Sequence, residues 1–262
     1  MKKILATVIS CFILSAGVHA QKQQKDYSKE DEKIYNVLAN LFTMDKFVKC
    51  IEECESYIKD ESTARSPYPY LYASMSFFAI YQDPESFDPK KLKDPGKFKD
   101  PLRKAISYLG RFKKKDKSGD LQRENADFMR DLTKGVLLEC ANLDSKKDYK
   151  NLQNIARDIA KNYEKDEGML IISGVYFLHS DVKLEGERNI ETAMNMLKKK
   201  KAEGTDKFDY DQADALSQAF IMYTDYLVDT KDVTKAKSTI EFAKSILPDN
   251  EKINKQSEKI GK

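Results

Sequence analysis

The sequence has 262 residues, with 46 Lys plus Arg against 43 Asp plus Glu and a formal net charge of +3 at pH 7. Proteins that bind nucleic acid usually gather a clear basic excess on one face, so this near balance argues against a nucleic-acid partner. Only 4 Cys and 2 His are present, which is sparse for a disulfide-rich exported scaffold and leaves little histidine for catalysis.

Residues 1–20 have the layout of a secretory signal peptide. A basic start precedes an apolar stretch over 4–18, and a small residue, Ala20, precedes Gln21. We predict cleavage after Ala20 and therefore export, to the periplasm or beyond the cell. The alternative is a lipoprotein processing box that ends at Cys11. That box would leave an apolar core of only about seven residues, at the lower limit for a signal.

After the signal, the predicted organisation is a mobile polar tail over 21–28, a helical domain over 29–248 and a polar capping segment over 249–262. The domain shows no sustained two-residue alternation, and its apolar residues recur at helical spacing, so we predict an all-α fold. No segment after the signal has the length of a membrane span. The expected helices are 31–43, 45–59, 70–81, 100–112, 121–143, 148–163, 168–179, 187–200, 211–228 and 232–247.

The segment 82–101 contains four Asp-Pro pairs, at positions 83, 88, 94 and 100. Proline disfavours helical geometry in the residue before it, so we predict a surface loop of turns or short N-capped half-turns. The aspartates are five or six residues apart, which does not match the alternating ligand spacing of a calcium loop.

The last two expected helices carry a pattern of large and small side chains. Ala236, Ile240 and Ala243 follow one another on the second helix before Pro248, and the first helix presents Phe220, Tyr223, Thr224 and Leu227. This pattern resembles the tetratricopeptide repeat, in which small side chains let paired helices approach closely and a proline ends the second helix. Similar anchors occur at Cys50, Ala105, Leu152 and Ala193, at spacings above the usual ~34 residues of this repeat.

The resemblance implies an α-α superhelix, a solenoid of about five antiparallel helix pairs with the first helix of each pair lining a concave groove. Partner segments bind in such grooves, and the inward positions of the repeat fall on Tyr35 in the first unit and on Gln218 and Asp225 in the last. The function implied is an exported, non-enzymatic scaffold or adaptor for a protein partner. Peripheral association with the cell envelope and the oligomeric state are left open.

An alternative function comes from the aromatic stretch 66–78. Tyr70 and Tyr72 lie in this stretch, and exposed aromatic rings can stack on sugars or anchor a ligand. The alternative is therefore a small-molecule or glycan-binding protein that uses this tyrosine-rich second unit. The competing structural interpretation is a helix that is apolar all round because neighbouring helices enclose it.

No cofactor, metal or catalytic residue is predicted. Cys50 and Cys54 are four residues apart, but a structural zinc site usually needs four ligands, so we interpret both as core residues. His179 has no recognisable catalytic motif around it, and no glycine-rich phosphate loop is present. The basic runs 111–117 and 197–204 fall where helices end, and lysines there favour the helix dipole.

Overall fold

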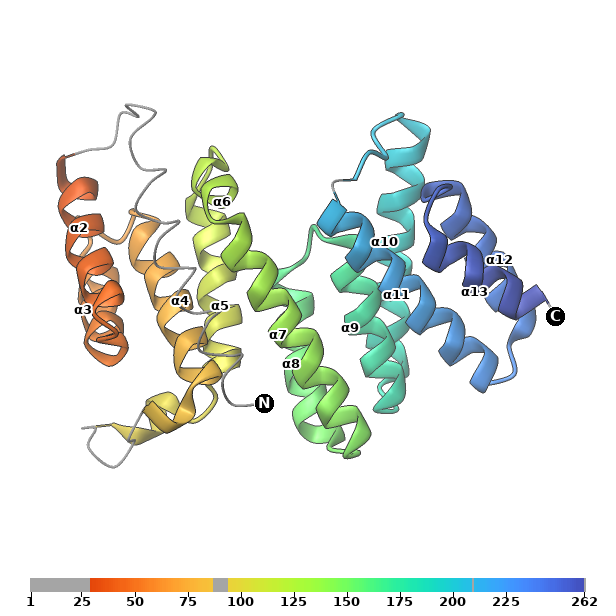
Figure 1. Ribbon diagram of the computed structural model, residues 1–262, viewed down its shortest axis with the longest axis horizontal. Helices are drawn as coiled ribbons and strands as arrows, with labels where there is room; N and C mark the ends of the chain where they lie inside the picture. Colours follow the sequence, from red (N-terminus) through yellow and green to blue (C-terminus); the bar gives the residue numbers. More distant parts are fainter. Residues whose placement is uncertain (1–28, 87–93, 209, 262) are drawn as a thin grey trace. The chain divides into compact units, whose positions relative to one another are not determined.

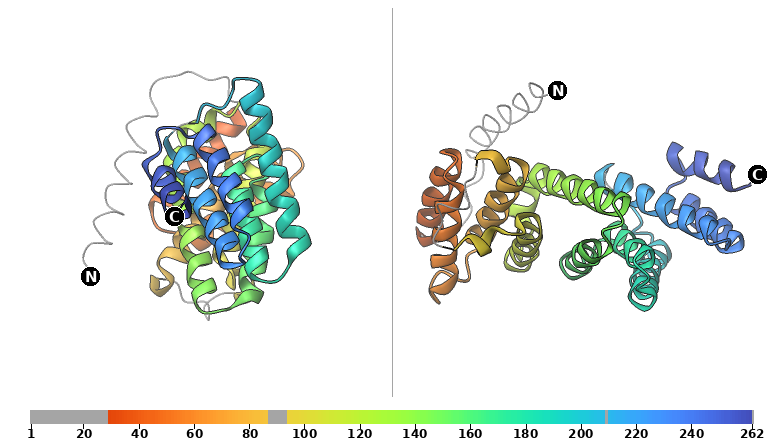
Figure 2. Two further views of the ribbon diagram at one scale, coloured as in Figure 1. Left: turned by 90° about the vertical axis from the view of Figure 1, so that its right-hand side faces the viewer. Right: turned by 90° about the horizontal axis from the view of Figure 1, so that it is seen from below.

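The structure is a computed structural model that describes residues 29–86, 94–208 and 210–261. Within those residues the chain forms twelve α-helices and two short 3₁₀ helices, without a strand (Figure 1, Figure 2). The predicted all-α class is confirmed. The predicted signal peptide 1–20 and tail 21–28 lie outside the described residues, as does the Asp-Pro pair at position 88.

The chain divides into two compact units. The first unit contains α2 (Lys29–Thr43), α3 (Phe47–Lys59), α4 (Tyr68–Gln82), η1 (Pro84–Ser86), η3 (Pro95–Phe98) and the last turn of α5 (Pro101–Lys115). The second unit contains the middle of α5, α6 (Asp120–Glu124), α7 (Ala126–Ser145), α8 (Tyr149–Asn162), α9 (Glu167–His179), α10 (Lys183–Ala202), α11 (Tyr210–Asp229), α12 (Val233–Ile246) and α13 (Glu251–Gly261).

In the first unit, α4 packs against both α2 and α3. Leu38, Cys50 and Phe77 are fully buried between these helices. Because α4 is apolar on all sides, it can lose water from its whole circumference, and its neighbours bury it almost completely. Packing therefore explains the aromatic stretch at the start of this helix.

In the second unit, most helices pack against their neighbours in the chain or one helix further on, whereas Arg103 of α5 pairs with Asp158 of α8. The pairs in contact include α7 with α8, α8 with α9, α9 with α10 and α11, and α11 with α12. Ala236 and Ala243, the small residues of the sequence pattern, are fully buried, as close packing of α12 requires. This packing of neighbours is the arrangement of a helical repeat.

Four of the turns between consecutive helices use one backbone conformation. Asp45, Lys147, Asp181 and Lys231 all have positive φ, between 54° and 66°. The N–H group of the next residue then donates to the carbonyl five residues back, for example from Asp148 to Leu143 at 2.9 Å. This is the hydrogen bond of a Schellman turn, which usually takes glycine at the left-handed position. None of the four is glycine, so the sequence carried no signal for these turns.

The prediction of one continuous helix over 121–143 is wrong. The structure divides it at Asn125, which ends α6 and precedes α7. The Asn125 side-chain amide donates to the Leu121 carbonyl at 2.8 Å. Asparagine side chains compete in this way with helical backbone bonds, and the short helix α6 stops there.

The described parts of the Asp-Pro segment form short turns, as predicted. Both 3₁₀ helices begin at the proline of an Asp-Pro pair, and Asp94 caps η3 by accepting from the Lys97 N–H. The segment is also anchored to the helices of its unit. Lys97 pairs with Glu55 on α3 at 2.6 Å, and the buried Phe98 ring lies 5.7 Å from that of Phe77.

Candidate functional site

The predicted partner-binding tyrosines form part of an aromatic cluster in the first unit. The Tyr35 ring on α2 lies 5.3 Å from that of Tyr68 and 6.2 Å from that of Tyr72, both on α4. Tyr35 is half-buried, whereas Tyr70 and Tyr72 are only 6% and 8% exposed. Burial raises the pKa of Tyr72 above its ordinary value. The cluster therefore binds α2 to α4 and leaves only Tyr35 partly open to solvent.

Tyr70 has a specific structural partner. Its hydroxyl donates to the Ala64 carbonyl at 3.3 Å, and the Lys115 ammonium donates to the same carbonyl at 2.8 Å. The ammonium also lies 5.5 Å from the centre of the Tyr70 ring. Tyr70 thus holds the end of α5 to the loop that precedes α4, and too little of its ring is exposed for a sugar to stack on.

The other two predicted residues, Gln218 and Asp225, lie on one face of α11 together with Asp214. These positions are four and eleven residues apart, close to whole numbers of helical turns. Gln218 Nε2 donates to Asp214 Oδ2 at 2.8 Å. We call Asp214, Gln218 and Asp225 the acid–amide row of α11. All three are only partly buried.

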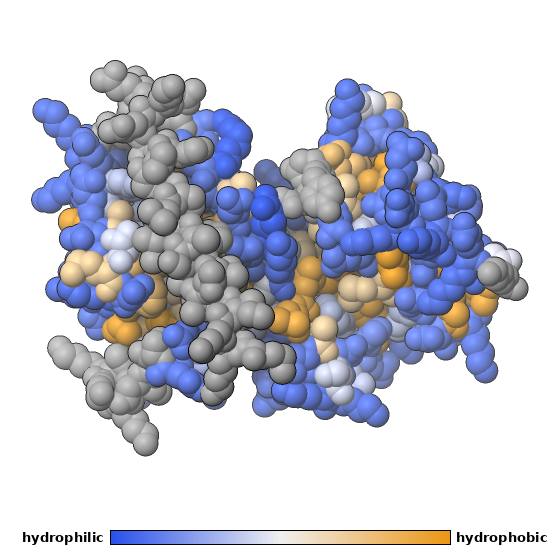
Figure 3. All heavy atoms as spheres, in the orientation of Figure 1, coloured by the Kyte–Doolittle hydropathy of each residue, from blue (hydrophilic) through white to orange (hydrophobic). Residues whose placement is uncertain are grey.

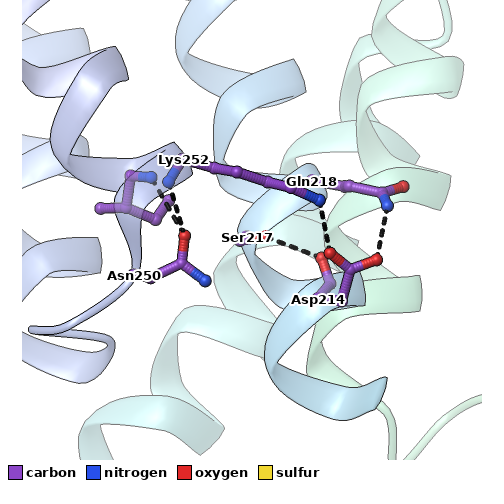
Figure 4. A network of polar contacts seen from close by, with 6 residues as sticks. Asp214, Ser217, Gln218, Asn250 and Lys252 are labelled. Atoms are coloured by element: carbon purple, nitrogen blue, oxygen red, sulfur yellow. Dashed lines mark hydrogen bonds and ion pairs between the residues drawn. The ribbon is translucent and has the colours of Figure 1, made fainter. Parts of the chain in front are cut away.

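Side chains of α13 bind this row. The Lys252 ammonium reaches one carboxylate oxygen of Asp214 at 2.5 Å, while Gln218 holds the other oxygen (Figure 4). Asn250 positions the start of α13, because its side-chain oxygen accepts from the backbone N–H groups of Lys252 and Ile253 at 3.0 and 3.2 Å. The first turn of α13 is therefore fixed against the first half of α11.

Two further side chains of α13 meet the far end of the row. Gln256 donates to Thr224 Oγ1 at 3.0 Å and to Asp225 Oδ1 at 2.9 Å. Lys259 donates to the same Asp225 oxygen at 2.8 Å, and this hydrogen bond raises the pKa of the Lys259 ammonium. The acid–amide row therefore recognises a stripe of three cationic or amide side chains on a helix.

The first helix of the preceding pair, α9, has no partly exposed polar face of this kind. Every residue of α9 from Glu167 to Leu178 is buried, so α9 has no open row to which a partner segment could bind. The last residue of α9, His179, is half-buried. Within the second unit, the acid–amide row of α11 is thus the partly exposed polar face that fits the predicted role best.

His179 links three helices at the ends of α7, α9 and α11. Its Nδ1 lies 3.1 Å from Asp144 Oδ2, and its ring stacks on Tyr226 with 5.5 Å between ring centres. Tyr176 approaches the imidazole edge-on at 6.3 Å. The sequence showed no catalytic motif around this histidine. Asp144 and Tyr226 were not foreseen, because they come from two other helices, α7 and α11, whereas Tyr176 lies on α9 itself, three residues before His179.

The cysteines are core residues. Cys50, Cys54 and Cys140 are buried and free, and Cys50 Sγ donates to the Leu38 carbonyl at 3.7 Å. Burial raises the pKa of the Cys54 and Cys140 thiols. In the part of the chain that the structure describes, no cluster of three or more His, Cys, Asp or Glu side chains is placed to hold a metal ion.

The surface is mainly polar on the face shown (Figure 3), and a few large apolar side chains are exposed. The face drawn in Figure 3 is mainly hydrophilic, with apolar residues showing in smaller patches. Leu138 and Leu184 are the most exposed large apolar side chains of the described residues, at 71% and 77%. None of the helices in the described ranges is both long and apolar enough to cross a membrane.

Comparison with known proteins gives no relative. No protein-family model, no curated protein and no solved structure matches this chain. The class of protein that the fold defines is an all-helical chain whose neighbouring helices pack as in a helical repeat. The candidate site within that class is the acid–amide row of α11.

Proposed function

We propose that this protein is an exported, non-enzymatic adaptor of the tetratricopeptide type, which binds a segment of a protein partner on the first helix of its last pair. The observation that carries the proposal is the contact between the acid–amide row and α13. Asp214 and Asp225 each accept a hydrogen bond from a lysine ammonium of that helix, at 2.5 and 2.8 Å. A face that binds one helix with these side chains is chemically suited to bind another.

Two observations support the tetratricopeptide assignment. The pattern of Phe220, Tyr223, Ala236 and Ala243 places buried large and small residues at the positions that the repeat uses. In addition, the left-handed turns at Lys147 and Asp181 are 34 residues apart, since 181 minus 147 is 34, which equals the usual period of about 34 residues.

The glycan-binding alternative loses its main support. It required exposed tyrosine rings in the second unit of the sequence pattern, and Tyr70 and Tyr72 are buried among neighbouring helices. We therefore retain the adaptor as the single proposal.

Site-specific photo-crosslinking tests the adaptor in cells that produce the protein naturally. A photoreactive phenylalanine analogue replaces Gln218 in the row, and the matched control places the same analogue at the exposed Ser238 on α12. We expect a discrete protein to be crosslinked at 218 and not at 238. Equal patterns at both positions would remove the support for binding at the row.

Export is tested separately by isolating the protein from its cells and sequencing its N-terminus. We expect the chain to begin at Gln21 and to be found outside the cytoplasm. A cytoplasmic chain that still begins with Met1 would contradict the exported role while leaving the binding face unaffected.

A further inference from the structure

The helix α13 does more than cover the end of the stack. A terminal cap has only to shield the apolar face of the last pair, and Ile253 and Ile260 perform that task, being 0% and 8% exposed. Lys252, Gln256 and Lys259 form a second stripe, four and three residues apart, and each reaches a residue of α11. This polar match is additional to what capping requires.

Gln256 fixes the position of α13 along α11. Its amide is buried and donates to Thr224 and Asp225 together. If the bound helix slipped by one turn, this amide would lose both acceptors while remaining buried, which is costly. The face beneath α13 therefore selects a helix that carries an amide between two lysines, four residues after the first and three before the second.

The ion pairs that hold α13 are individually weak. Both ion pairs are accessible to solvent: Lys252 is 55% exposed and Lys259 is 65% exposed. Exposed pairs of this kind are screened by water and salt. The helix has 11 residues, and so short a helix is only marginally stable alone. It can therefore leave its place without unfolding the rest of the unit.

We propose that the face of α11 and α12 beneath α13 is the docking site for a basic amphipathic helix of the partner protein, and that α13 occupies this site until such a helix displaces it. The partner helix carries the pattern Lys-Ile-x-x-Gln-x-x-Lys-Ile, which is the pattern of residues 252–260. This inference rests on the proposed adaptor function, because it names the chemistry of the segment that the acid–amide row binds.

A second copy of the chain fits this site less well than a different protein. An identical α13 has no advantage over the one already attached, whose effective concentration is high because it is tethered. Exchange between copies would also require the connection between α12 and α13 to straighten, and Pro248 prevents the two helices from joining into one. A partner helix can be longer, and can thereby gain contacts that α13 lacks.

The test uses a fluorescently labelled synthetic peptide with the sequence of residues 250–261. It is titrated against the full protein carrying Lys259→Glu, which places a carboxylate beside Asp225 and loosens α13. The matched control is Lys255→Glu, because Lys255 is exposed and, among the described residues, pairs with Glu251 on its own helix alone. We expect the peptide to bind the Lys259→Glu protein at least tenfold more tightly than the control protein. A peptide with glutamate at both outer positions of its stripe should not bind.

A reducible crosslink between α13 and α12 tests whether the peptide binds at the site that α13 occupies. Ser257 on α13 lies 3.1 Å from Glu241 on α12, and neither belongs to the acid–amide row. Cysteines at these two positions, joined by a thiol-specific crosslinker that reductant removes, hold α13 in place. We expect peptide binding to be lost in the locked Lys259→Glu protein and restored by reductant. Binding that persists in the locked protein would place the peptide elsewhere and overturn the proposal.

Hydrogen exchange of the unaltered protein gives an independent measurement in case a variant fails to fold. The amides of α13 should exchange at least tenfold faster than those of α11 and α12. Equal protection of all three helices would mean that α13 leaves only on global unfolding, and would overturn the proposal, as would a dimer in solution that exchanges α13 between copies. If crosslinks form at position 218 while the peptide fails these tests, the adaptor function stands and only the displacement of α13 is wrong.

Discussion

Gly174 on α9 and Gly186 on α10 face each other so closely that a Cβ added to either would lie 2.8 Å from the carbonyl oxygen of the other. Real Cβ atoms are not found this near to backbone oxygen. The added atom at Gly174 would also lie 2.5 Å from Ile190 Cγ1. Because a helix backbone cannot shift as a side chain can, both positions require glycine for the two helices to pack as they do.

Replacing Gly186 with alanine should therefore destabilise the protein. Overpacking at a helix crossing costs about 1–3 kcal/mol, which exceeds the helix propensity of about 1 kcal/mol that alanine adds over glycine. We expect the free energy of unfolding, measured by urea denaturation, to fall by up to about 2 kcal/mol, which is the difference between these two effects. Gly261→Ala is the control, because nothing lies within 4 Å of its added Cβ. A Gly186→Ala protein as stable as the control would show that the helices can move apart.

The sequence predicted the buried alanines of α12 and Ala193 of α10, but it did not predict the roles of Gly174 and Gly186. Ala236 and Ala243 stand at the spacing of a known repeat and are buried as expected. Gly174 and Gly186 stand within helices, where glycine alone suggests a weak point. Their role arises from the crossing of two helices, and no local pattern within either helix specifies that crossing.

The left-handed turn at Lys147 leads to a second prediction about stability. Lys147 pays a steric cost of about 1–2 kcal/mol for its positive φ of 56°, and glycine removes that cost while adding about 0.4–1 kcal/mol of entropy to the unfolded chain. We expect Lys147→Gly to raise the free energy of unfolding by about 0.5–1 kcal/mol. Lys146→Gly is the matched control. Lys146 has φ −83°, so glycine there should lower stability by about 0.5–1 kcal/mol.

A buried chain of hydrogen bonds joins three helices of the second unit. Asn189 on α10 donates to Ser173 Oγ at 3.1 Å, and Ser173 donates to the Ala156 carbonyl on α8 at 2.8 Å. Ser173→Ala should cost about 1–3 kcal/mol in unfolding free energy, because the Asn189 amide then stays buried without this acceptor. The exposed Ser238→Ala should cost almost nothing. Adding Asn189→Leu to Ser173→Ala should recover part of the loss, and a further loss would contradict this account.

The candidate site was half predictable. The resemblance placed Gln218 and Asp225 on the inward face of α11, and the structure brings both into contacts with polar side chains. Asp214 was missed, although its spacing from Gln218 puts it on the same face. Lys252 and Lys259 could not be found from sequence, because a lysine that pairs across helices looks the same in the sequence as one that is solvated.

Buried phenols make the stability of the protein sensitive to alkali. Burial raises the pKa of Tyr163 and Tyr176 above the ordinary value of 10.0. Their contribution to stability is therefore fully present below about pH 10 and is lost as pH rises further, since the unfolded chain releases these protons first. We expect the urea midpoint to fall above about pH 10, and we expect unfolding in this pH range to add a step of tyrosinate absorbance. Tyr163→Phe should lessen this fall, and replacement of the exposed Tyr149 should not.

The energetics of α13 lead to the last prediction. Its exposed ion pairs contribute little, because water and salt screen them, and burial of Ile253 and Ile260 contributes about 1.5–3 kcal/mol each before the cost of ordering the helix. Ordering the helix offsets this gain by about 1–2 kcal/mol for each residue, so the net contribution of α13 is small beside a typical domain stability of about 5–15 kcal/mol. Ile253→Ala should therefore speed hydrogen exchange in α13 about tenfold or more, a change of ~1.4 kcal/mol, and leave the global unfolding midpoint almost unchanged. Lys255→Ala, on the exposed face, should leave both unchanged. A shift of the global midpoint by Ile253→Ala would show instead that α13 unfolds together with α11 and α12.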